Sequence, residues 1–537
     1  MARRLAIGIW LLEKTGIFTH CPIRGHKVFI WTLTFLCYTG YYLTRKPFSV
    51  VKSVLCPYCS NRSQLNYSYA VNGSNTVTGW APFNGTNGET LLGAMDYSLL
   101  FAYAVGTYVS GFIADKVNTR YFLTIGMLGC ALSSILMGVA YFANIHHVSY
   151  FIVVQIMGGL MQSTGWAILI ACLASWFGKQ GRGLIMGLWS IDIGSILATL
   201  IASIWATPNG AWGWSFVVPG LIMAGLGAAA FIFLVPDPAD LGLVVGQVID
   251  PPATHGDAPA TTLQAQQTKM TKIKNIFMGI PRALLIPGVI EYSLVFFFVK
   301  LVNYTFKFWL PYYIANNAVG GVLLTGQVAG WLSTLFDVGG IVGIVGLGFL
   351  SDLAGSRAAP IAIVQFITIP VLYIYRVYGG VSYASQVTLL MVNGVMVQST
   401  YGIISAAVTS DLGTHPTLKK DENFKATVTG IINGTGAIGA AIGPLLAGWI
   451  TNDYGWDKTF YVLMGANFLA GVFLSRLAIK DVKKWFEAIR DRLKTYQYRV
   501  LPSATEFHVQ VPEGRVSGEE GGSETEKQGS GTKDTIL

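Results

Sequence analysis

The sequence predicts an all-α membrane protein with twelve transmembrane helices in two pseudo-symmetric halves of six. The 537-residue chain is 52% hydrophobic and only 12% charged, whereas a soluble protein carries about 25% charged residues. Its apolar runs are each long enough for the ~20 helical residues that cross a bilayer. An internal repeat relates the two halves of the chain. The net charge of +9 therefore indicates the Lys/Arg bias of membrane loops rather than affinity for nucleic acid.

The runs exceed the length of buried strands, so they are expected to be helices. A long polar stretch precedes the first run, which argues against a cleaved signal peptide. The predicted spans are 28–51, 91–114, 121–142, 150–173, 184–206, 214–235, 286–314, 326–350, 358–378, 385–409, 426–450 and 459–479.

Motifs that recur in matching order show that six spans are duplicated. The pattern G-F-x-x-D-x-x-x-x-R follows both the second and the eighth span, and QST occurs in both the fourth and the tenth. We expect the motif charges to gate conformational change and to say nothing of substrate. In the charged motif, Asp115 and Arg120 of the first half correspond to Asp352 and Arg357 of the second half. The QST motif is at residues 162–164 in the first half and 398–400 in the second.

The repeat divides the chain into two halves with flanking segments. The linker is low in large apolar residues, which predicts mobility. The expected regions are a cytoplasmic N-terminus (1–27), the N-terminal half (28–235), a cytoplasmic linker (236–285), the C-terminal half (286–479) and a cytoplasmic tail (480–537).

The distribution of positive charge predicts the orientation. The loops on the side of the termini hold 17 Lys and Arg before Arg476, and the opposite loops hold four, Lys52 among them. Both termini are therefore expected in the cytoplasm. The outer loop 52–90 then carries the Asn-x-Ser/Thr sequons, which predicts glycosylation and a membrane of the secretory pathway. Those sequons are Asn61, Asn66, Asn72 and Asn84.

The outer loop also contains the sequence CPYC, at Cys56 to Cys59. Redox catalysis by such a pair needs a thiolate stabilised at a helix start in a βαβ unit. The surrounding sequence has no such unit. We therefore expect a local disulfide or two unreactive thiols, and not a redox enzyme.

Cations lie inside the first span. Tyr38, Tyr41 or Tyr42, and Arg45 share one helical face. Arg45 either extends to the far interface or points into a polar cavity. A cation in the bilayer centre costs at least about 2.5–3.5 kcal/mol, so an idle arginine there is unexpected.

The seventh span repeats this pattern with Lys300, Asn303 or Tyr304, and Lys307. Lys300 is too deep in its span to reach the interface. Cations that exceed the matching acids imply an anionic cargo, and an Arg/Lys cradle with tyrosines suits a phosphate ester. Asp96, Asp192, Glu291 and Asp337 are the acids of the spans, and Asp337 is the deep one.

No histidine lies inside a predicted span, which argues against a histidine proton relay and against a metal site. We expect no cofactor.

The stretches YYLTRKPFS, TLFDVGG, VTSDLGTH, NGTGAIGAAIGPLLAG and PDPADLG resemble the sugar-phosphate exchangers, solute carrier family 37. These belong to the organophosphate:phosphate antiporters of the major facilitator superfamily. The resemblance implies the major facilitator fold and a transporter that exchanges a glucose-6-phosphate or glycerol-3-phosphate type of ester for inorganic phosphate by alternating access. It implies no enzyme activity.

The resemblance also assigns residues. Arg45 matches the family's first-span phosphate arginine, and Lys46 is its usual neighbour. Asp337 falls where bacterial members carry a glutamate, and Tyr401 matches a cavity-facing aromatic.

The chain departs from the family at two relevant places. The seventh-span arginine of bacterial members aligns with Asn303, so Lys300 or Lys307 must replace it; we favour Lys300 because it is deeper. Asp192 stands where close relatives have histidine, in a shortened fifth span. Asp192 is therefore a candidate for charge balance or proton coupling.

A transporter-shaped sensor or scaffold that binds phosphate esters without moving them is the alternative function. The expected membrane is the endoplasmic reticulum, with the lysosomal and plasma membranes as alternatives. The segment 480–499 has the pattern of a basic amphipathic helix on an anionic leaflet. The rest of the tail has a disordered composition, and the terminal DTIL fits the pattern of a PDZ-domain ligand.

Overall fold

The computed structural model describes a bundle of helices that overlap the predicted spans. The described residues are 23–57, 79–114, 117–177, 189, 192–207, 210–241, 284–408, 412 and 423–500.

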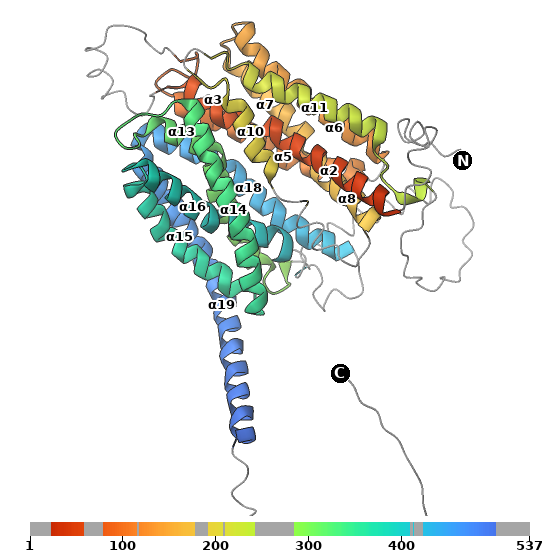
Figure 1. The fold of residues 1–537 in the computed structure, drawn as a ribbon, viewed down its shortest axis with the longest axis vertical. Helices are drawn as coiled ribbons and strands as arrows, with labels where there is room; N and C mark the ends of the chain where they lie inside the picture. Colours follow the sequence, from red (N-terminus) through yellow and green to blue (C-terminus); the bar gives the residue numbers. More distant parts are fainter. Residues whose placement is uncertain are drawn as a thin grey trace, which may run out of the picture. The chain divides into compact units, whose positions relative to one another are not determined.

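The N-terminal half contains long helices that pack against one another (Figure 1). The first and fourth predicted spans are each broken into two helices. In chain order the helices are α2 (Ile23–Arg45), α3 (Pro47–Leu55), α5 (Gly88–Ala114), α6 (Thr119–Phe142), α7 (Val148–Gln162), α8 (Gly165–Phe177), α10 (Ile193–Ser203) and α11 (Trp214–Phe233), and the short 3-10 helix η2 (Pro238–Leu241) follows.

The C-terminal half is also helical, and its first helix, α13, is unbroken (Figure 1). Its helices are α13 (Val289–Asn316), α14 (Gly326–Leu353), α15 (Ala358–Tyr378), α16 (Tyr383–Ile403) with the π-helical turn η3 (Ile404–Val408), α18 (Asn423–Tyr454) and α19 (Trp456–Val500). The helix α19 is continuous through the predicted twelfth span and the basic segment after it. Residues up to Lys483 belong to one compact unit, and Lys484 begins a second.

Within the described residues, six helical stretches are long and apolar enough to cross a membrane. Helices α7 and α10 are apolar but shorter, as is Ile168–Phe177 in α8. The break between α7 and α8 falls at Ser163 and Thr164, whose hydroxyls bond to the carbonyls of Leu160 and Met161. Such hydrogen bonds from side chain to backbone compete with the backbone hydrogen bonds of the helix.

The start of the predicted outer loop needs correction. We counted Lys52 among the cations of loop 52–90, but it lies in α3 and is fully buried. Pro47 begins α3, in the first-turn position where its missing N–H costs nothing. An ion pair between Lys52 and Asp96 permits this burial. The sequence gives no sign of this pair, because its members are 44 residues apart.

Helices of the two halves contact each other where α5 packs against α18, α10 against α14, and α3 against both α13 and α14. Helices α5 and α18 approach each other closely at Gly93 and Gly448. A Cβ atom on Gly93 would lie 3.2 Å from the Gly448 Cα atom. Small residues allow such backbone contact between membrane helices.

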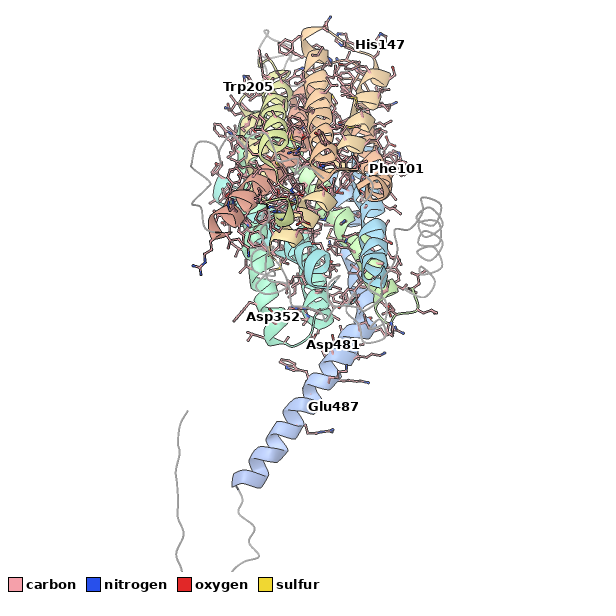
Figure 2. All side chains as sticks on the ribbon, turned by 90° about the vertical axis from the view of Figure 1, so that its right-hand side faces the viewer. Phe101, His147, Trp205, Asp352, Asp481 and Glu487 are labelled. Carbon is pink, nitrogen blue, oxygen red and sulfur yellow. The ribbon has the colours of Figure 1, made fainter. Side chains whose placement is uncertain are left out.

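His147, before α7, and Asp352, near the end of α14, mark opposite ends of the helical bundle (Figure 2). One apolar cluster contains side chains of both halves, including Phe83, Phe151 and Trp309. Trp80 packs against this cluster, and its ring lies 4.7 Å from that of His146. The apolar core that joins the halves therefore includes the His147 end.

Toward the Asp352 end, each half has an apolar cluster of its own. One cluster contains Trp176 and Val235 of the N-terminal half. The other contains Ile286 and Leu474 of the C-terminal half. The halves thus share a core toward the His147 end and have separate cores toward the Asp352 end.

Candidate functional site

A break in the first predicted span positions two cations. Helix α2 ends at Arg45, and Pro47 starts α3. The ring of a proline cannot donate a backbone hydrogen bond and crowds the preceding turn, so it kinks a helix. Arg45 and Lys46 are only 8% and 5% exposed. Arg45 therefore points into the protein interior and does not extend to an interface.

Arg45 is held by polar and aromatic groups of the N-terminal half. Its Nε atom donates to the Gln162 side-chain oxygen at 2.5 Å. Its guanidinium lies 4.5 Å from the ring centre of Tyr103 and 5.6 Å from that of Tyr42. None of the described residues gives it a carboxylate partner. The positive charge is oriented but not neutralised.

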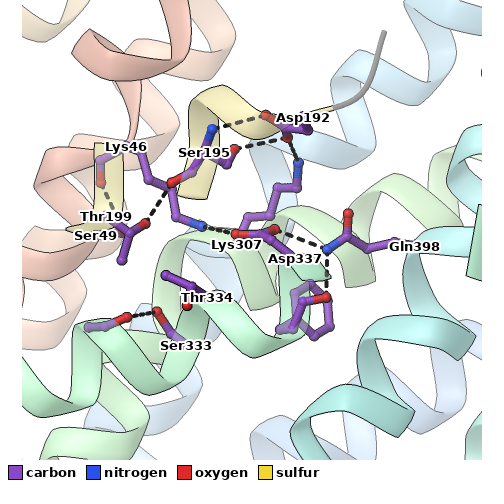
Figure 3. Close-up of polar contacts among 12 residues, drawn as sticks. Lys46, Ser49, Asp192, Ser195, Thr199, Lys307, Ser333, Thr334, Asp337 and Gln398 are labelled. Atoms are coloured by element: carbon purple, nitrogen blue, oxygen red, sulfur yellow. Dashed lines mark hydrogen bonds and ion pairs between the residues drawn. The ribbon is translucent and has the colours of Figure 1, made fainter. Parts of the chain in front are cut away.

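Lys46 reaches across to the other half. Its ammonium lies 3.6 Å from a carboxylate oxygen of Asp337 on α14. The other oxygen of Asp337 accepts a hydrogen bond of 3.0 Å from Gln398 (Figure 3). Gln162 and Gln398 are the glutamines of the repeated QST motif, and each contacts a charged side chain of the site.

A second ion pair also joins the halves, but here the lysine belongs to the C-terminal half and the acid to the N-terminal half. Lys307 of α13 donates to Asp192, which caps the start of α10 (Figure 3). Asp192 also accepts from the Ser195 backbone N–H at 3.1 Å and from its hydroxyl at 2.9 Å. Asp192 therefore neutralises Lys307 and begins a helix.

Lys300 differs from Lys307. It is partly exposed, and its ammonium lies 4.5 Å from the ring centre of Phe296. None of the described residues gives it a carboxylate partner. Arg45 and Lys300 are thus two interior cations that no carboxylate among the described residues neutralises.

Tyrosines surround these charges. Lys307 lies 5.5 Å from the Tyr42 ring and 5.9 Å from the Tyr401 ring. Tyr304 has its ring 6.4 Å from that of Tyr401. Tyr41 turns away, and its hydroxyl lies 3.2 Å from that of Thr164 at the break between α7 and α8. The structure therefore places Tyr42, Tyr304 and Tyr401 beside the cations and Tyr41 in the core of the N-terminal half.

Three of the predicted gating residues lie at helix ends: Arg120 at the start of α6, Asp352 at the end of α14 and Arg357 just before α15. Arg357 pairs with Asp352 at 2.6 Å. Arg120 is 9% exposed and lies 5.4 Å from the Tyr121 ring. Asp115 lies outside the described residues, so its gating role stays a prediction.

Other predictions fall partly on described residues. Asn84 is exposed, and its glycosylation stays a prediction. Cys56 forms a disulfide bond, and its local pairing with Cys59 stays a prediction. The remaining positions, which are Cys59, Asn61, Asn66, Asn72 and the terminal DTIL, lie outside the described residues.

Sequence reasoning missed three parts of this site. It did not assign Tyr103 or Gln162 to the surroundings of Arg45. It treated QST only as a sign of duplication, although a glutamine in the same place of both halves was a usable signal. It also treated Asp192 as a possible proton carrier and did not pair it with Lys307.

Comparison with known proteins assigns the family. A model described as Major Facilitator Superfamily matches residues 35–417 and 292–498. A putative glycerol-3-phosphate transporter of Arabidopsis thaliana is 41% identical over 484 residues, which are 89% of this chain and 92% of that protein. A glucose-6-phosphate exchanger of Homo sapiens is 40% identical over 504 residues, 90% and 97% of the two chains.

The chain belongs to the sugar-phosphate exchanger family, solute carrier family 37, of the major facilitator superfamily. This membership confirms the predicted fold class and a transporter rather than an enzyme. The structure of a D-xylose–proton symporter matches with a TM-score of 0.54 and 13% identity, over 83% of this chain and 97% of the symporter. A bacterial homologue of the human lysosomal transporter Spinster matches with a TM-score of 0.53 and 13% identity, over 87% and 98%. This exchanger-family chain is a multi-pass membrane protein.

Proposed function

We propose that this chain exchanges a phosphate ester for inorganic phosphate by alternating access. One observation carries the proposal. Lys46 and Lys307 each have a carboxylate partner, whereas Arg45 and Lys300 have none among the described residues. Desolvated cations without partners are costly, so they favour an anionic ligand. A phosphate dianion carries the two negative charges that neutralise this pair.

The chemistry of Arg45 supports phosphate in particular. Gln162 holds its Nε atom, which fixes the plane of the guanidinium fork. A planar fork binds two phosphate oxygens at once, and a lysine adds a point charge beside it. Lys300 therefore complements Arg45, and we favour it over Lys307 as the seventh-span cation of the site.

The ion pairs between the halves support alternating access. In one ion pair, Lys46 of the N-terminal half contacts Asp337 of the C-terminal half. In the other, Lys307 of the C-terminal half contacts Asp192 of the N-terminal half. Rocking of one half against the other must lengthen or break these contacts. Parallel halves with a midplane site between them are typical of this superfamily.

The similar proteins support the class of cargo. They are named for glycerol-3-phosphate and for glucose-6-phosphate, so we propose an ester of one of these types. We further propose an endoplasmic reticulum membrane, cytoplasmic termini and glycosylation of the outer loop.

One experiment distinguishes a transporter that exchanges its cargo from a sensor that only binds it. Purified protein in proteoliposomes loaded with inorganic phosphate is supplied with labelled glycerol-3-phosphate or glucose-6-phosphate outside. A transporter takes up label against an equal loss of phosphate. A sensor binds the ester, as detected by thermal stabilisation of the protein, but gives no uptake above protein-free vesicles.

A further inference from the structure

The side chain of Asn303 has a hydrogen-bonding capacity that the described protein does not use. Asn303 is 0% exposed, and both its Oδ1 and its Nδ2 atoms lack a hydrogen-bond partner. A buried polar group without a partner costs about as much as a lost hydrogen bond, so each such group needs an explanation. Asn303 has two such groups, so the energetic cost is incurred twice in one side chain.

Other buried asparagines behave differently. Asn467 of α19 is 3% exposed, and its amide donates to the Leu463 carbonyl one turn earlier, at 2.8 Å. Asn316, at the end of α13, bonds in the same way to the Tyr312 carbonyl at 3.0 Å. Asn303 makes no such bond although it lies in the same helix as Asn316. Its amide is therefore not used to satisfy its own helix.

Helix geometry places Asn303 on the cation stripe of α13. It is three residues after Lys300 and four before Lys307, and such neighbours share a face with Cβ atoms about 5–6 Å apart. Lys300 on this face is partly exposed. A ligand whose phosphate rests on Arg45 and Lys300 would thus carry its organic part within reach of Asn303.

We propose that Asn303 is a specificity-determining residue that binds a hydroxyl group of the organic part of the cargo. This inference rests on the proposed function. An amide offers one acceptor and one donor group, and a hydroxyl can satisfy both because it donates and accepts. The cargo class is therefore a phosphate ester that carries a hydroxyl group rather than an ester with an apolar chain.

The conformation described here seals the Asn303 amide from water. Cargo therefore reaches it as the bridges Lys46–Asp337 and Lys307–Asp192 open. Binding of the hydroxyl then compensates an amide that is unsatisfied in the empty carrier. Sites that hydrogen-bond a substrate hydroxyl discriminate strongly against analogues that lack it.

The test compares Asn303→Leu, which keeps the size of the side chain and removes its polar atoms, with the matched control Asn467→Leu. Each protein, in proteoliposomes loaded with inorganic phosphate, is supplied with labelled phosphate, glycerol-3-phosphate, glucose-6-phosphate or n-propyl phosphate, which has no hydroxyl on its chain. We expect wild type and Asn467→Leu to prefer a hydroxylated ester over n-propyl phosphate by at least about tenfold, as loss of one buried hydrogen bond implies. Asn303→Leu should lose most of this preference, so its exchange of the hydroxylated esters should fall by about tenfold more than its phosphate–phosphate exchange.

Equal losses for all four cargos in Asn303→Leu, or an unchanged preference, would overturn the role of Asn303. Absence of any exchange by the wild type would instead contradict the proposed function. In that event the same preference is measured as ligand-induced thermal stabilisation, which does not need transport. If Asn303→Leu does not fold, Asn303→Ala serves as the second variant in both assays.

Discussion

At the scale of single residues, the interior cations fall into two classes. Lys46, Lys52 and Lys307 each have a carboxylate partner. Arg45 and Lys300 have none among the described residues. The first class forms ion pairs within the protein, and we propose that the second binds the cargo.

Substitution Arg45→Lys tests the second class. It keeps the charge and loses the planar fork, so we expect phosphate exchange to fall by about 10- to 100-fold, the equivalent of one charged hydrogen bond. The amount of folded protein in the membrane should not change. Initial rates of exchange in proteoliposomes measure the effect. A rate equal to that of the wild type would show that the fork does not bind cargo.

The bridge between Lys307 and Asp192 tests the first class. Removing one partner of a buried pair leaves an uncompensated charge and costs about 3–5 kcal/mol, whereas replacing both is often neutral. Lys307→Met and Asp192→Asn should therefore each lower the thermal stability of the purified protein. The double variant should recover most of the loss. A double variant as unstable as the sum of the single ones would show that the two side chains do not act as a pair.

These residues show what the sequence could predict. Arg45 and Lys300 stood out because a cation in a long apolar run is costly and therefore informative. Asp192 and Lys307 were both noticed, but their pairing was not. In the sequence 115 residues separate them, and they meet only because α10 packs against α14, which in turn packs against α13. The unsatisfied state of Asn303 has no sequence signature at all.

At the scale of elements, the kink at Pro47 and the short helix α3 connect the site to the His147 end. Lys52 of α3 pairs with Asp96 of α5 and donates to the Phe308 carbonyl of α13 at 3.0 Å. Its ammonium also lies 4.1 Å from the Trp309 ring. One fully buried lysine thus attaches α3 to the other half.

Removing this attachment should loosen the His147 end. The variant Lys52→Met with Asp96→Asn avoids an unpaired buried charge and removes the bond to α13. Loss of a charged hydrogen bond, about 1.5–3 kcal/mol, shifts a two-state equilibrium by about tenfold or more. A cysteine placed at Ser53 should then react several-fold faster with a membrane-impermeant thiol reagent. An unchanged rate would show that Lys52 does not hold this end closed.

The duplicated elements were largely predictable, because length and hydrophobicity define a membrane helix. The breaks within the helices were harder to predict. Pro47 could have predicted the break between α2 and α3, since proline cannot continue a helix. The break between α7 and α8 has no proline and depends on hydroxyl bonds at Ser163 and Thr164, which compete weakly with the helix.

At the scale of the whole transporter, separate apolar cores toward the Asp352 end and a shared core toward the His147 end describe a state closed toward one side. The duplication of the halves could be recognised from repeated motifs. The sequence could not show which end is closed, because the closed end depends on small differences in packing between conformations of one sequence. The predicted orientation would make the closed end the outer one.

The charges of the site predict obligatory exchange. In the empty carrier, Arg45 and Lys300 remain unneutralised. Two such charges at about 6 Å and an effective dielectric constant near 20 repel by roughly 3 kcal/mol, and closure removes their water as well. A bound phosphate dianion cancels this repulsion, so the loaded carrier should change conformation more readily than the empty one.

The measurement that tests this claim most directly is uptake of a labelled phosphate ester by proteoliposomes with and without phosphate inside. About 3 kcal/mol in the barrier corresponds to a rate difference of about 100-fold, so uptake should be at least tenfold faster with internal phosphate. A neutral sugar inside should give no acceleration. Equal rates into phosphate-loaded and phosphate-free vesicles, with equal amounts of folded protein, would contradict the account.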